Sequence, residues 1–280
     1  STSWVFVANE GNFGSTNGTI SMIGDDGVVL TTDIIGATVQ SIEVYNNKLI
    51  VLINGDSKMK IFDITSEGLS MPGIEIDLDG SGPRFMAVVD HEGIENDKIY
   101  FTNWNSEDIK VFNLYTYAIE SSISVNGKPE GIVERDGYLW VALVNNSDWS
   151  AGTSVNRYDV ATHALLSTYN VGEGPSSFEF LGDELYISRT YYNEDYTAIN
   201  HGIAKISGTS LDKGLTSIIF LSQDLDFKIA FAFILSSIAP LKFPCLNFFS
   251  LDLVSLIIFP NINSLESFIY LSEPRLMLSE

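Results

Sequence analysis

The chain repeats one short motif: Gly80-Ser-Gly-Pro83, Asn126-Gly-Lys-Pro129 and Gly172-Glu-Gly-Pro175. The prolines of these copies lie 46 residues apart, twice. One period earlier stands Gly36-Ala-Thr38, with Thr38 in the place of the proline. Self-similarity at a period of about 20–50 residues is the signature of a repeat architecture. We therefore expect one structural unit to recur through this part of the chain.

Four short runs follow each copy of the motif, separated by turns and polar loops. After Pro83 they are Arg84-Phe-Met-Ala-Val-Val, Lys98-Ile-Tyr-Phe-Thr, Lys110-Val-Phe-Asn-Leu and Ala118-Ile-Glu-Ser-Ser-Ile-Ser-Val. Short alternating runs bounded by Gly, Asn and Asp predict half-buried strands. Four such strands in a unit of about 45 residues predict the blade of a β-propeller.

The sequence therefore predicts an all-β fold, a β-propeller of four-stranded antiparallel blades. Residues 1–210 hold about four and a half blades at this period. The first blade is expected to begin at its second strand, near Trp4. A blade cannot bury both of its faces alone, so each blade must stack on its neighbours.

The strand sequences also resemble a known family. Ile99-Tyr-Phe-Thr-Asn-Trp104 and Val125-Asn-Gly-Lys-Pro-Glu-Gly-Ile132 are similar to the YVTN-type propeller repeat. Val5-Phe-Val-Ala-Asn-Glu-Gly-Asn-Phe-Gly14 resembles the first repeat of YncE-like cell-surface propellers that are common in Bacteroidetes. The resemblance covers about residues 3–210. It implies an exported protein of the periplasm or outer cell surface, in a group where some members capture nutrients such as corrinoids.

Composition divides the chain into two parts. Of the 22 glycines, 21 precede residue 211, whereas residues 211–280 are rich in Leu, Ile and Phe and carry no repeat. We expect a partial propeller over 1–210 and a hydrophobic tail over 211–280. The tail is either the product of a frame change or assembly junction near residues 207–216, or a native segment packed on the exposed blade edge.

Charge and cysteine content exclude several classes of partner. With 15 basic and 36 acidic residues the formal net charge is −21, which repels nucleic acid and anionic membrane surfaces. The single cysteine, Cys245, excludes an intrachain disulfide and a thiolate-rich metal site. The chain shows no signal peptide, so contact with a membrane is expected only through a lipid anchor that this sequence lacks.

The candidate site lies in the loops. In an antiparallel meander alternate connections share one face, so the Gly-x-Pro corners should lie beside the loops that join second and third strands. Asn and Arg side chains there can bind a polar ligand, and Trp and Tyr can stack on it. The candidates are Asn9, Asn12, Arg84, Asn103, Trp104, Asn145, Trp149, Arg189, Tyr191 and Tyr192. Each Asn is equally a turn former, and each Trp either contacts a ligand or braces a neighbouring blade.

These observations favour a non-catalytic binding module over an enzyme. Its ligand would be a small cofactor or a glycan, or its partner a protein. The alternative is a metal-dependent propeller hydrolase or lyase with a metal on the axis. Glu130 and Glu179 could point inward from first strands, but the pattern does not place them at the axis. The three histidines lack metal-ligand spacing, so no catalytic residue, metal site or cofactor is predicted.

Overall fold

The computed structural model describes residues 3–90, 97–193 and 195–207. Within these ranges the chain forms strands and no helix, and all strand pairs are antiparallel. None of these residues therefore forms an apolar helix long enough to cross a membrane. The predicted tail, 211–280, and Cys245 lie outside the described residues, so both readings of the tail stay predictions.

The strands form five sheets that follow one another along the chain. The first blade contains β1 (Trp4–Asn9), β2 (Thr19–Gly24) and β3 (Val29–Thr31). The second contains β4 (Val39–Tyr45), β5 (Lys48–Ile53), β6 (Lys58–Thr65), β7 (Gly68–Leu69) and β8 (Ile74–Asp77). The third contains β9 (Pro83–Val89), β10 (Lys98–Asn103), β11 (Asp108–Asn113) and β12 (Ala118–Ser124). The fourth contains β13 (Lys128–Arg135), β14 (Tyr138–Asn145), β15 (Ala151–Asp159) and β16 (Leu165–Asn170). The fifth contains β17 (Pro175–Leu181), β18 (Glu184–Tyr192) and β19 (Ile199–Ser207).

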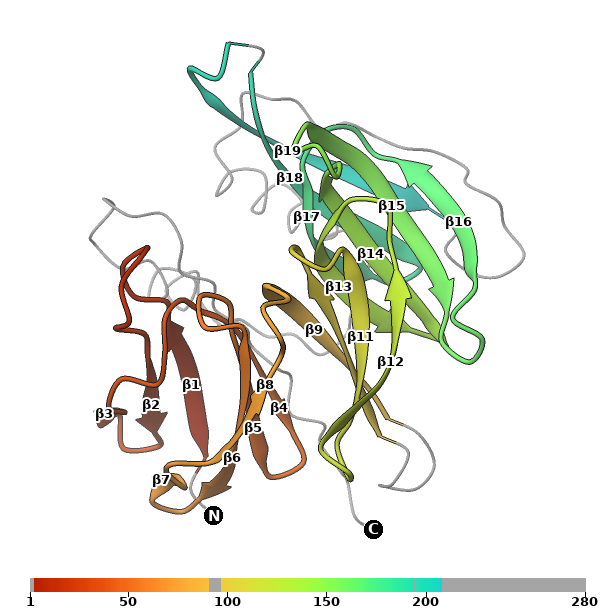
Figure 1. The fold of residues 1–280 in the computed structure, drawn as a ribbon. Coiled ribbons are helices and arrows are strands. Elements are labelled where there is room, and N and C mark those ends of the chain that lie inside the picture. Colours follow the sequence, from red (N-terminus) through yellow and green to blue (C-terminus); the bar gives the residue numbers. More distant parts are fainter. Residues whose placement is uncertain (1–2, 91–96, 194, 208–280) are drawn as a thin grey trace, which may run out of the picture.

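The five sheets stand side by side in chain order, from β1–β3 to β17–β19 (Figure 1). Their first strands make the contacts between neighbours: β4 lies against β9, β9 against β13, and β13 against β17. In the first blade β1 contacts β4 and only three strands are present, as expected for a blade that begins at its second strand. The predicted β-propeller architecture is thus confirmed.

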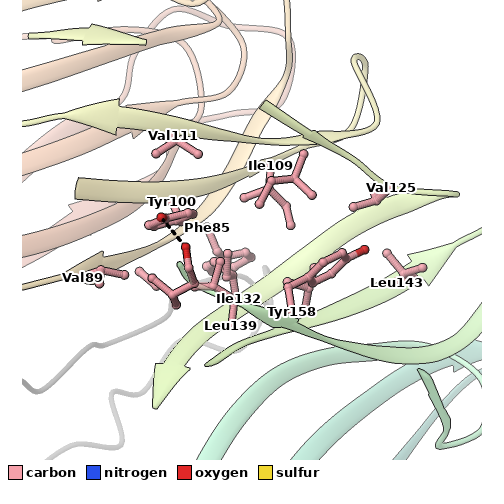
Figure 2. Packing of buried hydrophobic residues seen from close by; sticks show 14 residues of the cluster. Phe85, Val89, Tyr100, Ile109, Val111, Val125, Ile132, Leu139, Leu143 and Tyr158 are labelled. Atoms are coloured by element: carbon pink, nitrogen blue, oxygen red, sulfur yellow. Dashed lines mark hydrogen bonds between the residues drawn. The ribbon is translucent and has the colours of Figure 1, made fainter. Parts of the chain in front are cut away.

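Hydrophobic clusters fill the spaces between neighbouring blades. Figure 2 shows the cluster between the third and fourth blades, to which Tyr100 and Ile109 contribute from one side and Leu139 and Tyr158 from the other. Burial of one such large side chain stabilises the fold by about 1.5–3 kcal/mol. The core is therefore divided among the blade interfaces, which explains why the apolar pattern recurs along the sequence.

The glycine-rich corners lie beside the loops that join second and third strands. The backbone N–H of Trp104 donates to the carbonyl of Gly82 at 3.0 Å, and that of Gly55 to the carbonyl of Ala37 at 3.0 Å. Gly82 and Gly174 both have a φ of 67°, and a Cβ on Gly174 would lie 2.0 Å from the carbonyl oxygen of Thr190. Only glycine meets both demands. The predicted shared face is confirmed.

One sequence alignment is wrong by a residue. Val39, not Thr38, holds the place of Pro83, because each of these pairs with the last residue of the next strand in its blade. Thr38 itself adopts the left-handed conformation, with a φ of 57°, that Gly82 adopts in the third blade. A threonine in a position that favours glycine explains why the sequence alignment of this corner is shifted by one residue.

Candidate functional site

The corners and the loops between second and third strands make up the loop face. It consists of residues 10–18, 54–57, 104–107, 146–150, 193 and 195–198, with the corners 32–38, 78–82, 125–127 and 171–174. These connections are attached to the ends of paired strands, so the sheets position them beside one another on one face.

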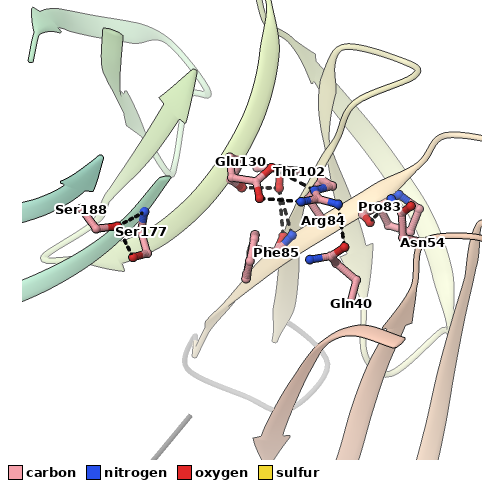
Figure 3. A network of polar contacts seen from close by, with 9 residues as sticks. All are labelled: Gln40, Asn54, Pro83, Arg84, Phe85, Thr102, Glu130, Ser177 and Ser188. Carbon is pink, nitrogen blue, oxygen red and sulfur yellow. Dashed lines mark hydrogen bonds and ion pairs between the residues drawn. The ribbon is translucent and has the colours of Figure 1, made fainter. Parts of the chain in front are cut away.

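An arginine joins three blades at the inner edge of this face. The Nε and Nη2 groups of Arg84 donate to the Glu130 carboxylate at 2.9 and 2.7 Å, and Nη1 donates to Gln40 Oε1 at 2.6 Å (Figure 3). These residues follow Pro83, Pro129 and Val39, so they occupy one repeat position in consecutive blades. The Arg84 and Glu130 side chains are only 17% and 8% exposed. The pair is a buried, bidentate ion pair whose two charges cancel.

Two tryptophans extend from this arginine toward solvent. The Arg84 guanidinium lies 4.1 Å from the centroid of the Trp104 ring, a cation–π contact. The Trp104 and Trp149 rings meet edge to face, with centroids 5.6 Å apart and an interplanar angle of 79°. Trp149 is 55% exposed, whereas Trp104 is partly buried. The structure therefore brings together three of the predicted site residues.

A lysine contacts the second of these tryptophans, Trp149. Lys128 Nζ lies 4.9 Å from the Trp149 centroid and donates to Glu107 Oε1 and, at 3.2 Å, to the carbonyl of Trp104. Ser147 Oγ donates to the second carboxylate oxygen of Glu107 at 2.7 Å. The bonds from Lys128 and Ser147 hold the pKa of Glu107 below its ordinary value. We call Arg84, Glu130, Trp104, Trp149, Lys128 and Glu107 the tryptophan cluster.

Two unfavourable features coincide in this cluster. The indole Nε1 of Trp104 is buried, and it meets no hydrogen-bond partner within the part of the chain that the structure describes. An unsatisfied buried donor costs about 1–3 kcal/mol. Trp149 has a φ of 69°, a left-handed conformation that is strained for a bulky residue. Such features gather at functional sites more often than elsewhere.

The predicted asparagines hold loops in place. Asn103 has no exposed surface, and its amide bonds to Ser81 Oγ at 2.8 Å and to the carbonyl of Phe101 at 3.1 Å. Asn145 Nδ2 donates to the carbonyls of Trp149 and Ser150, at 3.1 and 3.3 Å. Asn145 therefore supports the loop that presents Trp149, while Asn103 anchors the end of β10.

Asn9 and Asn12 lie in the first blade. Asn9 Nδ2 donates to the hydroxyls of Thr19 and Ser21 on β2, at 3.0 and 2.9 Å. The backbone N–H of Asn12 donates to Asn17 Oδ1 at 2.8 Å. These contacts close the β1–β2 loop on itself, and neither residue is joined to the tryptophan cluster by a contact between described residues.

Arg189, Tyr191 and Tyr192 belong to the β18–β19 hairpin of the fifth blade. Arg189 is buried, its Nε donates to the carbonyl of Glu173 at 2.9 Å, and its guanidinium lies 5.0 Å from the Tyr191 ring. Burial lowers the pKa of the Arg189 guanidinium. Tyr192 is 55% exposed and its ring lies 6.0 Å from that of Tyr196. These contacts define a second aromatic group within the fifth blade.

Sequence reasoning missed Gln40, Lys128 and Glu107, and it left Glu130 unplaced. A signal existed for the ion pair, because Arg84 and Glu130 carry opposite charges at the same repeat position, 46 residues apart. Among residues 3–90, 97–193 and 195–207, no three His, Cys, Asp or Glu side chains converge in a way that could hold a metal ion.

Comparison with solved structures agrees with this architecture. A protein from Bacteroides uniformis, provisionally assigned as a 6-phosphogluconolactonase, has a TM-score of 0.58 and 12% identity, covering 79% of this chain and 68% of its own. A protein from Bacteroides fragilis with the same provisional assignment has a TM-score of 0.57 and 15% identity, with coverages of 80% and 68%. The Pan2 WD40 domain of Neurospora crassa has a TM-score of 0.51 and 11% identity, with coverages of 72% and 58%. Such identities establish the fold class, a β-propeller, and nothing finer.

No family model matches the chain, and no curated protein matches its sequence.

Proposed function

We propose that this chain is a non-catalytic binding propeller, and that the tryptophan cluster on its loop face is the ligand site. The observation that carries the proposal is the pairing of the exposed Trp149 ring with the unsatisfied indole N–H of Trp104, 5.6 Å between ring centroids. One offers a flat apolar surface and the other a hydrogen-bond donor, which is the combination that small polar ligands with apolar faces require.

Substitution of the two tryptophans tests the site. We expect Trp149→Ala and Trp104→Ala to weaken binding by about tenfold or more, as aromatic anchors of binding sites do. The matched control is Tyr115→Ala, since Tyr115 is 63% exposed on the β11–β12 connection, at the opposite end of the blades. The measurement is binding to a broad panel of glycans, cofactors and peptides, with circular dichroism to verify folding. Unchanged binding in both tryptophan variants rules out this site.

The hydrolase alternative has one observation in its favour, the provisional 6-phosphogluconolactonase assignment of two structural neighbours. Metal content and lactone hydrolysis of the purified protein separate the two proposals. Stoichiometric bound metal together with turnover of a sugar lactone would replace the binding module by the enzyme.

The proposal includes an exported protein of the periplasm or outer surface, related to the YVTN-type and YncE-like propellers. Its support is the repeat sequences and the Bacteroides origin of two neighbours that share the fold. Fractionation of the source cells tests the location, and recovery of the chain with cytosolic proteins contradicts it.

A further inference from the structure

Each charged side chain of the tryptophan cluster already has a partner of opposite charge within the cluster. Arg84 is paired with Glu130, and Lys128 is paired with Glu107, whose second oxygen accepts from Ser147. An anionic ligand would have to displace one of these carboxylates, and a cationic ligand would have to displace the arginine or the lysine from its ring. Each sign of charge on a ligand therefore meets a like charge in the cluster. The chain's net charge of −21 adds a further penalty for anions.

Apart from the exposed Asp148 carboxylate, the groups that remain available around Trp149 are neutral. More than half of the Trp149 surface is exposed, although Lys128 lies over part of its ring. Around it stand the amides and hydroxyls of the 146–150 loop, where Asn146 Nδ2 donates to Ser150 Oγ at 2.9 Å. The exposed Asp148 carboxylate accepts from the N–H and Oγ of Ser150 at 3.0 and 2.6 Å, and its negative charge adds to the repulsion of anionic ligands. An indole surface ringed by hydroxyl and amide groups suits a ligand with C–H faces and hydroxyl edges.

The buried indole N–H of Trp104 specifies one more feature of the ligand. This N–H group lacks a partner within the described residues. A ligand oxygen that accepts a hydrogen bond from it would recover the free energy lost by burying the unpaired N–H. Reaching it requires the neighbouring side chains to shift. Trp149 contacts Trp104 edge to face and is 55% exposed, so its side chain has room to move toward solvent.

We infer that the ligand of the tryptophan cluster is a neutral saccharide, with a sugar ring stacked on Trp149 and a hydroxyl or ring oxygen accepting from Trp104. The inference rests on the proposed function, since it names the ligand class of that same site. It excludes sugar phosphates and uronic acids as preferred ligands.

The experiment compares matched saccharides. Wild-type protein and variants are applied to an array of neutral gluco-, galacto-, manno- and xylo-oligosaccharides and to their phosphorylated and uronic acid counterparts, and binding is quantified by calorimetry. We expect a neutral oligosaccharide to bind, and a phosphate or carboxylate on the same sugar to weaken binding by about tenfold or more. Trp149→Ala should lose binding by a similar factor, Trp149→Phe should keep part of it, and Tyr115→Ala should keep all of it.

A charge variant tests the reason for the preference. Glu107→Gln releases Lys128 from its carboxylate, so the difference in affinity between neutral and anionic sugars should shrink. Tighter binding of the anionic sugars to wild-type protein overturns the inference while leaving the site intact. Binding of a different ligand class that depends on Trp149, with no saccharide bound, does the same. Saccharide binding that is unaffected by both tryptophan variants overturns the proposed site itself.

Discussion

Glu43 is a carboxylate in an apolar setting. It lies on β4 between Ser41 and Tyr45, and side chains two apart on a strand share a face. Tyr45 packs against the cluster between the second and third blades, so Glu43 faces that interface as well. No hydrogen bond or ion pair reaches Glu43 from the described residues, and Ser41 Oγ, also buried, has no partner among them. Burial raises the pKa of Glu43 from 4.5 to about 7.

A pH dependence of stability follows from Glu43. The folded protein holds this proton more tightly than the unfolded chain, so the contribution of Glu43 to stability is greatest below pH 4.5 and is lost as the pH rises to about 7. Glu43→Gln removes this loss, and at pH 8 the variant should be more stable than wild type by on the order of 2 kcal/mol. Urea unfolding at pH 5 and pH 8 measures the difference, with the exposed Glu67→Gln as control. Parallel pH profiles for wild type and Glu43→Gln would contradict the prediction.

At the scale of elements, the first strands of the fourth and fifth blades approach each other closely. Gly131 lies on β13, and a Cβ there would stand 2.1 Å from the carbonyl oxygen of Ser176 on β17. The clashing atom belongs to the backbone, which cannot rotate out of the way as a side chain can. We expect Gly131→Ala to lower the free energy of unfolding by about 3 kcal/mol.

Gly202→Ala is the matched control for this close approach. Gly202 also lies within a strand, β19, and a Cβ there would have only the Arg189 side chain nearby, at 3.4 Å. Its cost should stay below about 1 kcal/mol, because that is ordinary van der Waals contact. Denaturant midpoints of the two variants provide the test, and equal costs would show that the β13–β17 contact yields easily.

Sequence periodicity predicted the strands because their chemistry is local. Alternating runs and glycine-rich corners express the preferences of single strands and turns, so the blades and the loop face could be inferred from them. The corner at Thr38 was found but aligned one residue out of register, because a threonine there takes the left-handed conformation of a glycine. The contacts of Trp104 with Trp149 and of Lys128 with Glu107 join different blades, and no local pattern encodes the distance between blades.

At the scale of the whole molecule, polar bonds between blades supplement the hydrophobic clusters. Thr102 Oγ1, without exposed surface, accepts from the N–H of Phe85 at 3.1 Å and donates to the carbonyl of Glu130 at 2.6 Å (Figure 3). Asn54 Nδ2 donates to the carbonyl of Pro83 at 2.9 Å, from the second blade to the third. In a repeat protein, stability depends on such nearest-neighbour interfaces. The bonds of Arg84 to Gln40 and to Glu130 join the second, third and fourth blades.

The last prediction concerns the ion pair of Arg84 and Glu130. Removing one member of a buried ion pair leaves the other charge uncompensated, so Arg84→Met and Glu130→Gln should each cost about 3–5 kcal/mol. The double variant leaves no buried charge behind, and it should cost less than the sum of the single variants by at least about 1 kcal/mol. Calorimetric unfolding of wild type, the two single variants and the double variant supplies the free energies for this double-mutant cycle. Additive costs would mean that the two charges do not depend on each other, and would contradict a stabilising role for their pairing.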